Sequence, residues 1–278
     1  MKKNLFSLFT LLLILFSIKV EAQKLEKLWE TDSIFKVPES VIFDEVNKVI
    51  YVSNIDGTNS WVKDGIGSIA KLSLDGRPIN IEWIKGLDAP KGMGIFKNHL
   101  YVADLTHIVV VDIKKSVIKN YIEIDSAIGL NDLTIDTEGN IYVSDSKAKK
   151  VFKVKDNIPE LLLQNLKAPN GLLVFNESLL LLDAGGLYEI MNDKTVVKIT
   201  DGMEGGTDGV VHVGDNEFIV SCWQGVIWFV NKEGEKKILL DTRLEKINTA
   251  DIWFNEKEQI VYIPTFWKNK IVAYKLVR

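Results

Sequence analysis

The sequence is poor in cysteine, histidine and proline. Cys222 is the single cysteine among 278 residues, so no disulfide can form within the chain and the fold must be closed by other means. No Walker-type phosphate loop, no Gly-x-Ser-x-Gly elbow and no clustered Lys/Arg run is present. These absences argue against a nucleotide-binding loop, a serine hydrolase of that class and a nucleic-acid partner. The three histidines, His99, His107 and His212, show no recognisable triad spacing.

Long apolar runs are also missing, apart from residues 5–18. Lys2-Lys3, this run and Val20-Glu21-Ala22 have the basic, apolar and small-residue pattern of a secretory signal peptide. As a helix the run would rise only about 21 Å, against a hydrocarbon core of about 30 Å, so it is too short for a membrane anchor. We therefore predict a signal peptide at residues 1–22. The mature chain, starting at Gln23, is expected to be exported to the periplasm or secreted, without a membrane attachment and as a monomer.

One pattern recurs six times in residues 23–278. Each copy has two short apolar strands joined by a polar turn, and the copy starting at Ala168 reads APNGLLVFNESLLLLDA. The same position of the successive copies is occupied by Glu39, Lys91, Asn131, Asn170, Asp208 and Ala250. These positions are separated by 52, 40, 39, 38 and 42 residues. A period near forty with paired strands is typical of the blades of a β-propeller.

A second pair of strands follows each hairpin, except that the last copy is one strand short. At the other end of the chain, residues 24–31 (KLEKLWET) have the alternation of an outer strand. Pairing this segment with the C-terminal strand would close the ring and hide two sheet edges. We therefore predict an all-β protein with a single domain at residues 23–278. This domain is a six-bladed β-propeller closed by pairing of an N-terminal strand with the C-terminal blade.

The aligned positions begin the innermost strands, so their side chains should meet at the central channel. Taken singly, Asn170-Gly171 and Asp208-Gly209 are ordinary turn dipeptides, but Glu39 and Asn131 occupy the same position without being part of such a turn. The adjacent residues Asp132 and Asp251 add carboxylates nearby.

Carboxylates that converge in a narrow channel repel one another, and a bound cation would relieve this repulsion. All candidate ligands are oxygens. We therefore expect a hard divalent cation, calcium first, with magnesium or manganese next and zinc less well suited. Lys91 leaves an alternative open, because its ammonium group could neutralise Glu39 without a metal.

Aromatic residues are expected above this hub. The connections between the second and third strands of each blade lie on the same face as the hub. The first of them, residues 55–67, is longer than the others and accounts for the 52-residue spacing, which exceeds the period near forty. We predict that this segment forms a flap over an aromatic rim that binds a small-molecule substrate. A single aromatic at a strand end could equally cap its sheet. The rim residues are Trp61, His107, Trp223, Phe266 and Trp267.

At these residues the chain resembles the SMP-30/gluconolactonase/luciferin-regenerating enzyme family of six-bladed propellers. The resemblance rests on Pro-Glu at 38–39, Asn-Asp at 131–132, Asn-Gly at 170–171 and Asp-Gly at 208–209, in this order at blade spacing. It implies that Glu39, Asn170 and Asp208 hold a divalent metal on the propeller axis. It also implies that Asn131 lies beside the metal and contacts the substrate or metal-bound water, and that Asp208 is the usual candidate for the general base in lactone hydrolysis.

Two departures from the family pattern stand out. Ser40-Val41 follows Glu39 where the family commonly has Gly-Pro, and Gly129 stands where sugar-lactonase members often place an arginine. The missing arginine side chain argues against a sugar lactone as substrate more than it argues against a bound metal.

The leading hypothesis is a metal-dependent lactonase or esterase, with Asp208, Asn131 and Lys91 as catalytic residues. Asp208 would take a proton from water, and Lys91 would stand near the developing negative charge. The alternative is a noncatalytic NHL-like propeller that binds a peptide or glycan and holds any metal structurally, because fold alone does not decide function. His212 and Cys222 are expected to be packed residues rather than catalytic ones.

Overall fold

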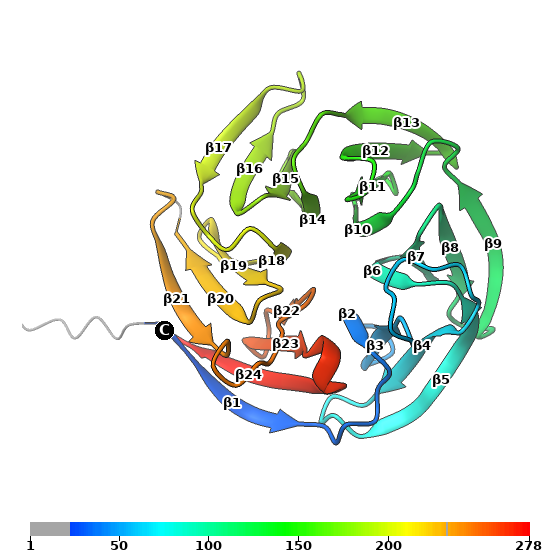
Figure 1. The fold of residues 1–278 in the computed structure, drawn as a ribbon, viewed down its shortest axis with the longest axis horizontal. Coiled ribbons are helices and arrows are strands. Elements are labelled where there is room, and N and C mark those ends of the chain that lie inside the picture. Colours follow the sequence, from blue (N-terminus) through cyan, green and yellow to red (C-terminus); the bar gives the residue numbers. More distant parts are fainter. Residues whose placement is uncertain (1–22, 232) are drawn as a thin grey trace, which may run out of the picture.

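The computed structural model describes residues 23–231 and 233–278, so the predicted signal peptide lies outside the described residues. The described chain forms six four-stranded antiparallel sheets around a central axis (Figure 1). This arrangement confirms the predicted six-bladed β-propeller. Within the described part of the chain, no helix has the length and apolar character needed to cross a bilayer.

Each of the first five blades is continuous in sequence, with its innermost strand first. Blade 1 contains β2 (Pro38–Asp44), β3 (Val49–Asn54), β4 (Gly67–Leu72) and β5 (Pro78–Leu87). Blade 2 contains β6 (Pro90–Phe96), β7 (His99–Asp104), β8 (His107–Asp112) and β9 (Val117–Glu123). Blade 3 contains β10 (Leu130–Ile135), β11 (Ile141–Asp145), β12 (Lys150–Lys155) and β13 (Ile158–Leu163). Blade 4 contains β14 (Pro169–Phe175), β15 (Ser178–Asp183), β16 (Gly186–Ile190) and β17 (Val196–Thr200). Blade 5 contains β18 (Thr207–Gly214), β19 (Glu217–Cys222), β20 (Val226–Val230) and β21 (Lys236–Asp241).

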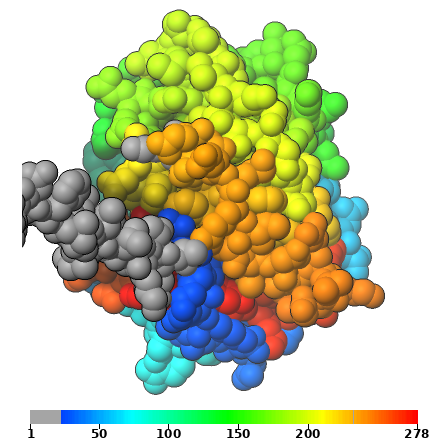
Figure 2. Space-filling view, turned by 90° about the vertical axis from the view of Figure 1, so that its left-hand side faces the viewer, coloured from blue at the N-terminus to red at the C-terminus, as the bar shows by residue number. Residues whose placement is uncertain are grey.

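The sixth blade is built from both ends of the described chain. It contains β22 (Trp253–Asn255), β23 (Ile260–Pro264), β24 (Ile271–Val277) and β1 (Lys24–Glu30), and a short 3-10 turn, η1 (Phe266–Lys268), lies between β23 and β24. β1 pairs antiparallel with β24, from Lys24 opposite Val277 to Glu30 opposite Val272. Figure 2 shows the blue N-terminal segment against the red C-terminal residues. The predicted closure of the ring is therefore confirmed, and it needs no disulfide.

The hydrophobic core lies between neighbouring blades. The inner strands β2 and β3 are buried along their whole length, whereas the outer strands β5 and β9 are largely exposed. Apolar side chains from adjacent blades interlock, as Ile42 and Tyr51 of blade 1 do with Val109 of blade 2. Burial of these side chains between sheets stabilises the ring and fixes each inner strand relative to its neighbours.

A repeated aspartate positions the start of several inner strands. Asp104, Asp145 and Asp183 each end the second strand of a blade and accept hydrogen bonds from two successive backbone N–H groups. The donors lie three and two residues before the aligned hub position: Asp88 and Ala89, Ile128 and Gly129, Lys167 and Ala168. These caps hold the chain at the point where it enters the channel.

Candidate metal and active site

The hub side chains come from irregular starts of the inner strands. In blades 1 to 5 the register with the second strand shifts at the hub residue, for example between Pro169 and Leu172 and between Thr207 and Val210. Such bulges re-aim side chains and are common next to active sites. Asn170-Gly171 and Asp208-Gly209 therefore lie inside strands, and the turn interpretation of these dipeptides is wrong.

The glycines of these bulges allow the blades to approach closely at the axis. A Cβ atom on Gly171 would overlap the backbone oxygen of Asp208, and one on Gly209 would overlap the Asp251 carboxylate. Gly92 would meet Asp132 in the same way. Glycine follows the hub residue in three blades because any side chain there would separate neighbouring blades.

Glu39 and Lys91 form a buried pair. They are 4% and 2% exposed, and Glu39 Oε1 lies 3.6 Å from Lys91 Nζ. The other carboxylate oxygen, Glu39 Oε2, is buried without a hydrogen-bond partner. Burial raises the pKa of Glu39, and the Lys91 charge opposes this effect. Lys91 therefore compensates one oxygen of the carboxylate and leaves the other uncompensated.

Asn170 and Asp208 form a second pair. Asn170 Nδ2 donates a hydrogen bond to Asp208 Oδ1 at 2.8 Å, and Asn170 Oδ1 is buried without a partner. Within the described residues, Glu39 Oε2 and Asn170 Oδ1 are the two buried side-chain oxygens in this condition. A buried unsatisfied acceptor costs about 1–3 kcal/mol, so such atoms call for an explanation.

Both unpaired oxygens belong to residues that the family resemblance assigns to a metal. Asp208, the third, is 3% exposed, and burial together with the charges of Glu39 and Asp251 raises its pKa well above the ordinary value. Oxygen donors from carboxylate and amide groups are those that calcium and magnesium prefer. The donor set of Glu39, Asn170 and Asp208 therefore fits a hard divalent cation.

Asn131 is oriented by a residue that sequence reasoning missed. Its Nδ2 donates to Ser146 Oγ at 2.9 Å, and Ser146 Oγ in turn donates to the backbone oxygen of Pro169 at 2.6 Å. Ser146 directly follows the capping residue Asp145. Its position next to this repeated aspartate is the sequence signal that could have identified Ser146. This chain of hydrogen bonds fixes the amide of Asn131, which is 7% exposed, next to the start of β14.

The flap residue Trp61 lies between two lysines. Its ring centroid is 4.4 Å from Lys91 Nζ and 4.6 Å from Lys147 Nζ. A side chain at Gly129 would overlap both Trp61 and Lys147. Gly129 therefore makes room for Lys147 beside Trp61, and Lys147 was not anticipated from the sequence.

The other predicted rim residues differ in exposure. Trp223 and Trp267 are 37% and 46% exposed, whereas Phe266 is only 4% exposed and packs in an apolar cluster with Val37 and Ile55. The rings of Phe266 and Trp267 are perpendicular, with centroids 4.8 Å apart. Phe266 thus supports the rim from below instead of lining it.

His107 belongs to an acidic group on blade 2. Its Nε2 lies 3.6 Å from Asp104 Oδ2, its ring packs edge-on against Tyr121, and Asp88 completes a group with metal-ligand spacing. Asp104 already accepts two backbone N–H bonds, as the capping aspartates of other blades do without a histidine. The fold therefore accounts for this group.

The residues expected to be packed are placed as follows. Cys222 is buried, and burial raises its thiol pKa. His212 packs against Phe175 and Phe218.

Comparison with known proteins identifies the fold. No family model and no curated protein matches the chain. Among solved structures, a protein provisionally assigned as a gluconolactonase matches with a TM-score of 0.68 at 13% identity, over 92% of this chain and 93% of that one. An inactive virginiamycin B lyase from Staphylococcus aureus with quinupristin gives 0.66 at 10% identity, over 92% and 100%. A chain of a nidogen/laminin complex gives 0.64 at 19% identity, over 78% and 84%. At these identities the likeness shows the propeller fold and nothing finer.

Proposed function

We propose that the protein is a metal-dependent hydrolase that opens a small lactone or carboxylic ester at the hub. The observation that carries the proposal is the pair of buried oxygens without partners, Glu39 Oε2 and Asn170 Oδ1, beside the buried carboxyl of Asp208. When bound by these three residues, a divalent cation, calcium first, supplies a Lewis acid for the substrate carbonyl group and offsets the buried negative charge.

The roles of the chain's own residues follow from their contacts. Asp208, held by Asn170 Nδ2, accepts a proton from the attacking water. Lys91 stabilises negative charge that develops on the carbonyl oxygen. Asn131, fixed through Ser146, donates or accepts a hydrogen bond that positions the substrate. Trp61 covers the hub and excludes water.

The comparisons support this proposal at the level of the scaffold. Two of the similar structures carry enzyme names, a gluconolactonase and a lyase, so propellers of this shape hold catalytic sites. The nidogen/laminin structure has the same fold in a complex of a different kind. The choice between enzyme and binding module therefore rests on the hub residues, where a protein-binding propeller has no need for converging carboxylates.

The decisive experiment measures turnover of a panel of lactones and esters by residues 23–278, with calcium and with chelator. Asp208→Asn keeps size and one oxygen but removes the proton acceptor, and it should lower turnover by about 10²-fold or more. Asn170→Ala should weaken calcium binding, with activity partly restored at high calcium.

Two other outcomes would reject the enzyme proposal. A purely structural metal predicts that both substitutions lower the melting temperature while the unsubstituted protein turns over no substrate. If Lys91 replaces the metal, elemental analysis would find no bound cation and chelator would change neither stability nor activity.

A further inference from the structure

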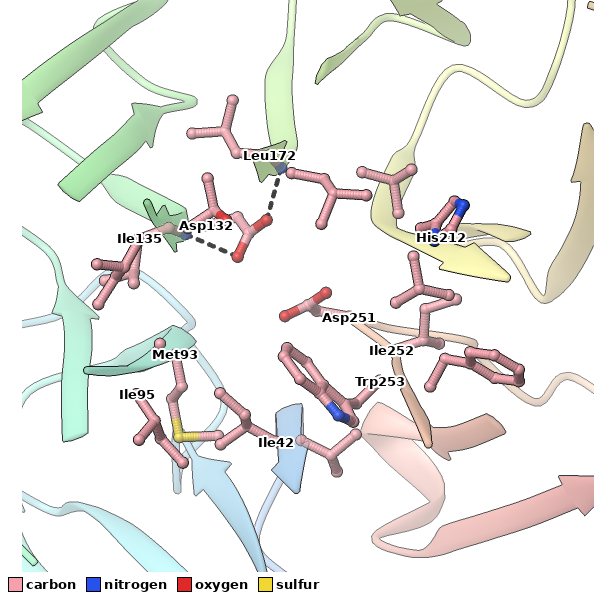
Figure 3. A pocket seen from close by; sticks show the side chains of 18 of the residues that line it. Ile42, Met93, Ile95, Asp132, Ile135, Leu172, His212, Asp251, Ile252 and Trp253 are labelled. Atoms are coloured by element: carbon pink, nitrogen blue, oxygen red, sulfur yellow. Dashed lines mark hydrogen bonds between the residues drawn. The ribbon is translucent and has the colours of Figure 1, made fainter. Parts of the chain in front are cut away.

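A cavity of about 310 Å³ opens at the end of the channel opposite the flap. Its walls come from the later residues of the innermost strands and from the turns that follow β2 and β22. They are mostly apolar, and Figure 3 shows the side chains around the opening. The labelled apolar residues are Ile42, Met93, Ile95, Ile135, Leu172, Ile252 and Trp253.

The polar lining of this cavity consists mostly of acidic side chains. Asp132 and Asp251 lie at its inner end, and in Figure 3 their carboxyl groups face the open space from opposite sides. Glu45 and Glu256, on the turns after β2 and β22, are exposed at the outer end. Among the described residues that line it there is no lysine or arginine, and His212 is the one basic residue.

The two inner carboxyl groups are fixed by the fold. Asp132 accepts hydrogen bonds from the backbone N–H groups of Leu133 and Leu172, both at 2.7 Å, and Asp251 accepts one from the Ser40 hydroxyl at 2.5 Å. A carboxylate offers about four acceptor positions, so Asp132 keeps acceptor capacity towards the cavity. Lys91 pairs with Glu39 and is not among the residues that line this cavity.

Charge, shape and size together define a ligand. We propose that this cavity binds a small organic ammonium ion, with its charged end between Asp132 and Asp251 and its apolar body along the aliphatic walls. The indole of Trp253 offers a further favourable surface for a cation. The volume equals that of about ten water molecules, which suits a ligand of about ten non-hydrogen atoms. The site uses none of the three proposed metal ligands, although Asp251 is close enough to Glu39 and Asp208 for their charges to interact.

The test is isothermal titration calorimetry of the mature chain with 2-phenylethylamine at about pH 9, where the Asp251 carboxyl, with a pKa of about 8, is mostly ionised and the amine still carries its proton. Its neutral and anionic counterparts, 2-phenylethanol and 3-phenylpropanoate, separate charge from apolar contact. We expect the amine to bind at least tenfold more tightly than the alcohol, and the carboxylate not to bind. Asp251→Asn should reduce amine affinity by about tenfold or more, the scale of a lost charged hydrogen bond, and leave alcohol binding unchanged.

A second variant keeps the test independent of folding effects at Asp251. Glu256→Lys adds a positive charge at the exposed mouth and should weaken amine binding several-fold. Glu177→Lys makes the same change on the corresponding turn of blade 4, outside the cavity lining, and should have no effect.

Equal binding of amine and alcohol, or binding of neither, would overturn the proposal. A competition experiment could also overturn it. In that outcome calcium displaces the amine from the unsubstituted protein and from Asn170→Ala alike, and calcium no longer binds in this cavity in Asp251→Asn. That result would assign the aspartate pair to a metal ion.

Discussion

The substitution Asp251→Asn should remove a large part of the pH dependence of stability. Asp251 is 9% exposed, and burial, followed by the charge of Glu39, raises its pKa from 3.8 to about 8. Because the folded protein binds this proton more tightly than the unfolded chain, the stabilisation is complete below about pH 4. It is lost progressively as the pH rises towards 8.

The size of the effect follows from the width of this window. Between pH 5 and pH 8 the unfolded chain has released a proton that the folded protein retains, and each pH unit changes the free energy of unfolding by about 1.4 kcal/mol. The contribution of one such group to the free energy of unfolding therefore falls by about 4 kcal/mol over this range. For a domain of this size that corresponds to a melting temperature lower by about 8–16 °C.

The assay is thermal and urea unfolding at pH 5, 6, 7 and 8 in the presence of chelator. Burial also raises the pKa of Asp132 and Asp208, so the informative quantity is the difference in slope between variant and unsubstituted protein. Asp251→Asn should flatten the profile, whereas the exposed control Glu45→Gln should not. Parallel profiles for all three proteins would refute the argument that Asp251 stays protonated when folded.

Two further predictions concern the ring and the flap. Deleting residues 24–30 leaves blade 6 with three strands and β24 as an open edge. The melting temperature of the whole domain should therefore fall. An unchanged melting temperature would disprove the closing role of β1. Trp61→Ala removes the ring between Lys91 and Lys147 and should raise KM for the substrate while calcium affinity stays the same. Ile158→Ala, at the start of the outer strand β13, serves as the exposed apolar control. An equal weakening of substrate binding and of calcium affinity in Trp61→Ala would place the flap in the metal site or in the fold.

The fold was predictable because its information is local and repeated. Each blade carries alternating apolar strands, and the aspartate that caps the entry to the channel recurs at the end of second strands, as Asp104, Asp145 and Asp183 show. The last blade was one strand short and residues 24–31 offered one extra strand, so the two could be matched by counting strands. Repetition of this kind determines both the number of blades and the residues that reach the axis.

The details that escaped prediction depend on contacts between distant segments. Lys147 reaches Trp61 from another blade, and nothing in the spacing of either residue indicates the contact. Phe266 was expected on the rim, but η1 brings it into an apolar cluster, and Asn269, whose side-chain oxygen accepts a hydrogen bond from Val37 N, ties this turn to blade 1. A strand repeat predicts where a side chain leaves the backbone but not the direction in which a loop turns it.

The hub also bears on whether Lys91 could replace a metal. One ammonium group faces the buried carboxyls of Glu39 and Asp208, and it is shared with the ring of Trp61. After Lys91 has paired with Glu39 Oε1, Glu39 Oε2 and Asn170 Oδ1 still lack partners. An amide oxygen cannot be satisfied by protonation at ordinary pH, whereas a carboxylate can. Protonation of Glu39 and Asp208 would remove their charge, whereas a bound cation would take an oxygen of all three residues as a ligand, which is what the proposed function requires.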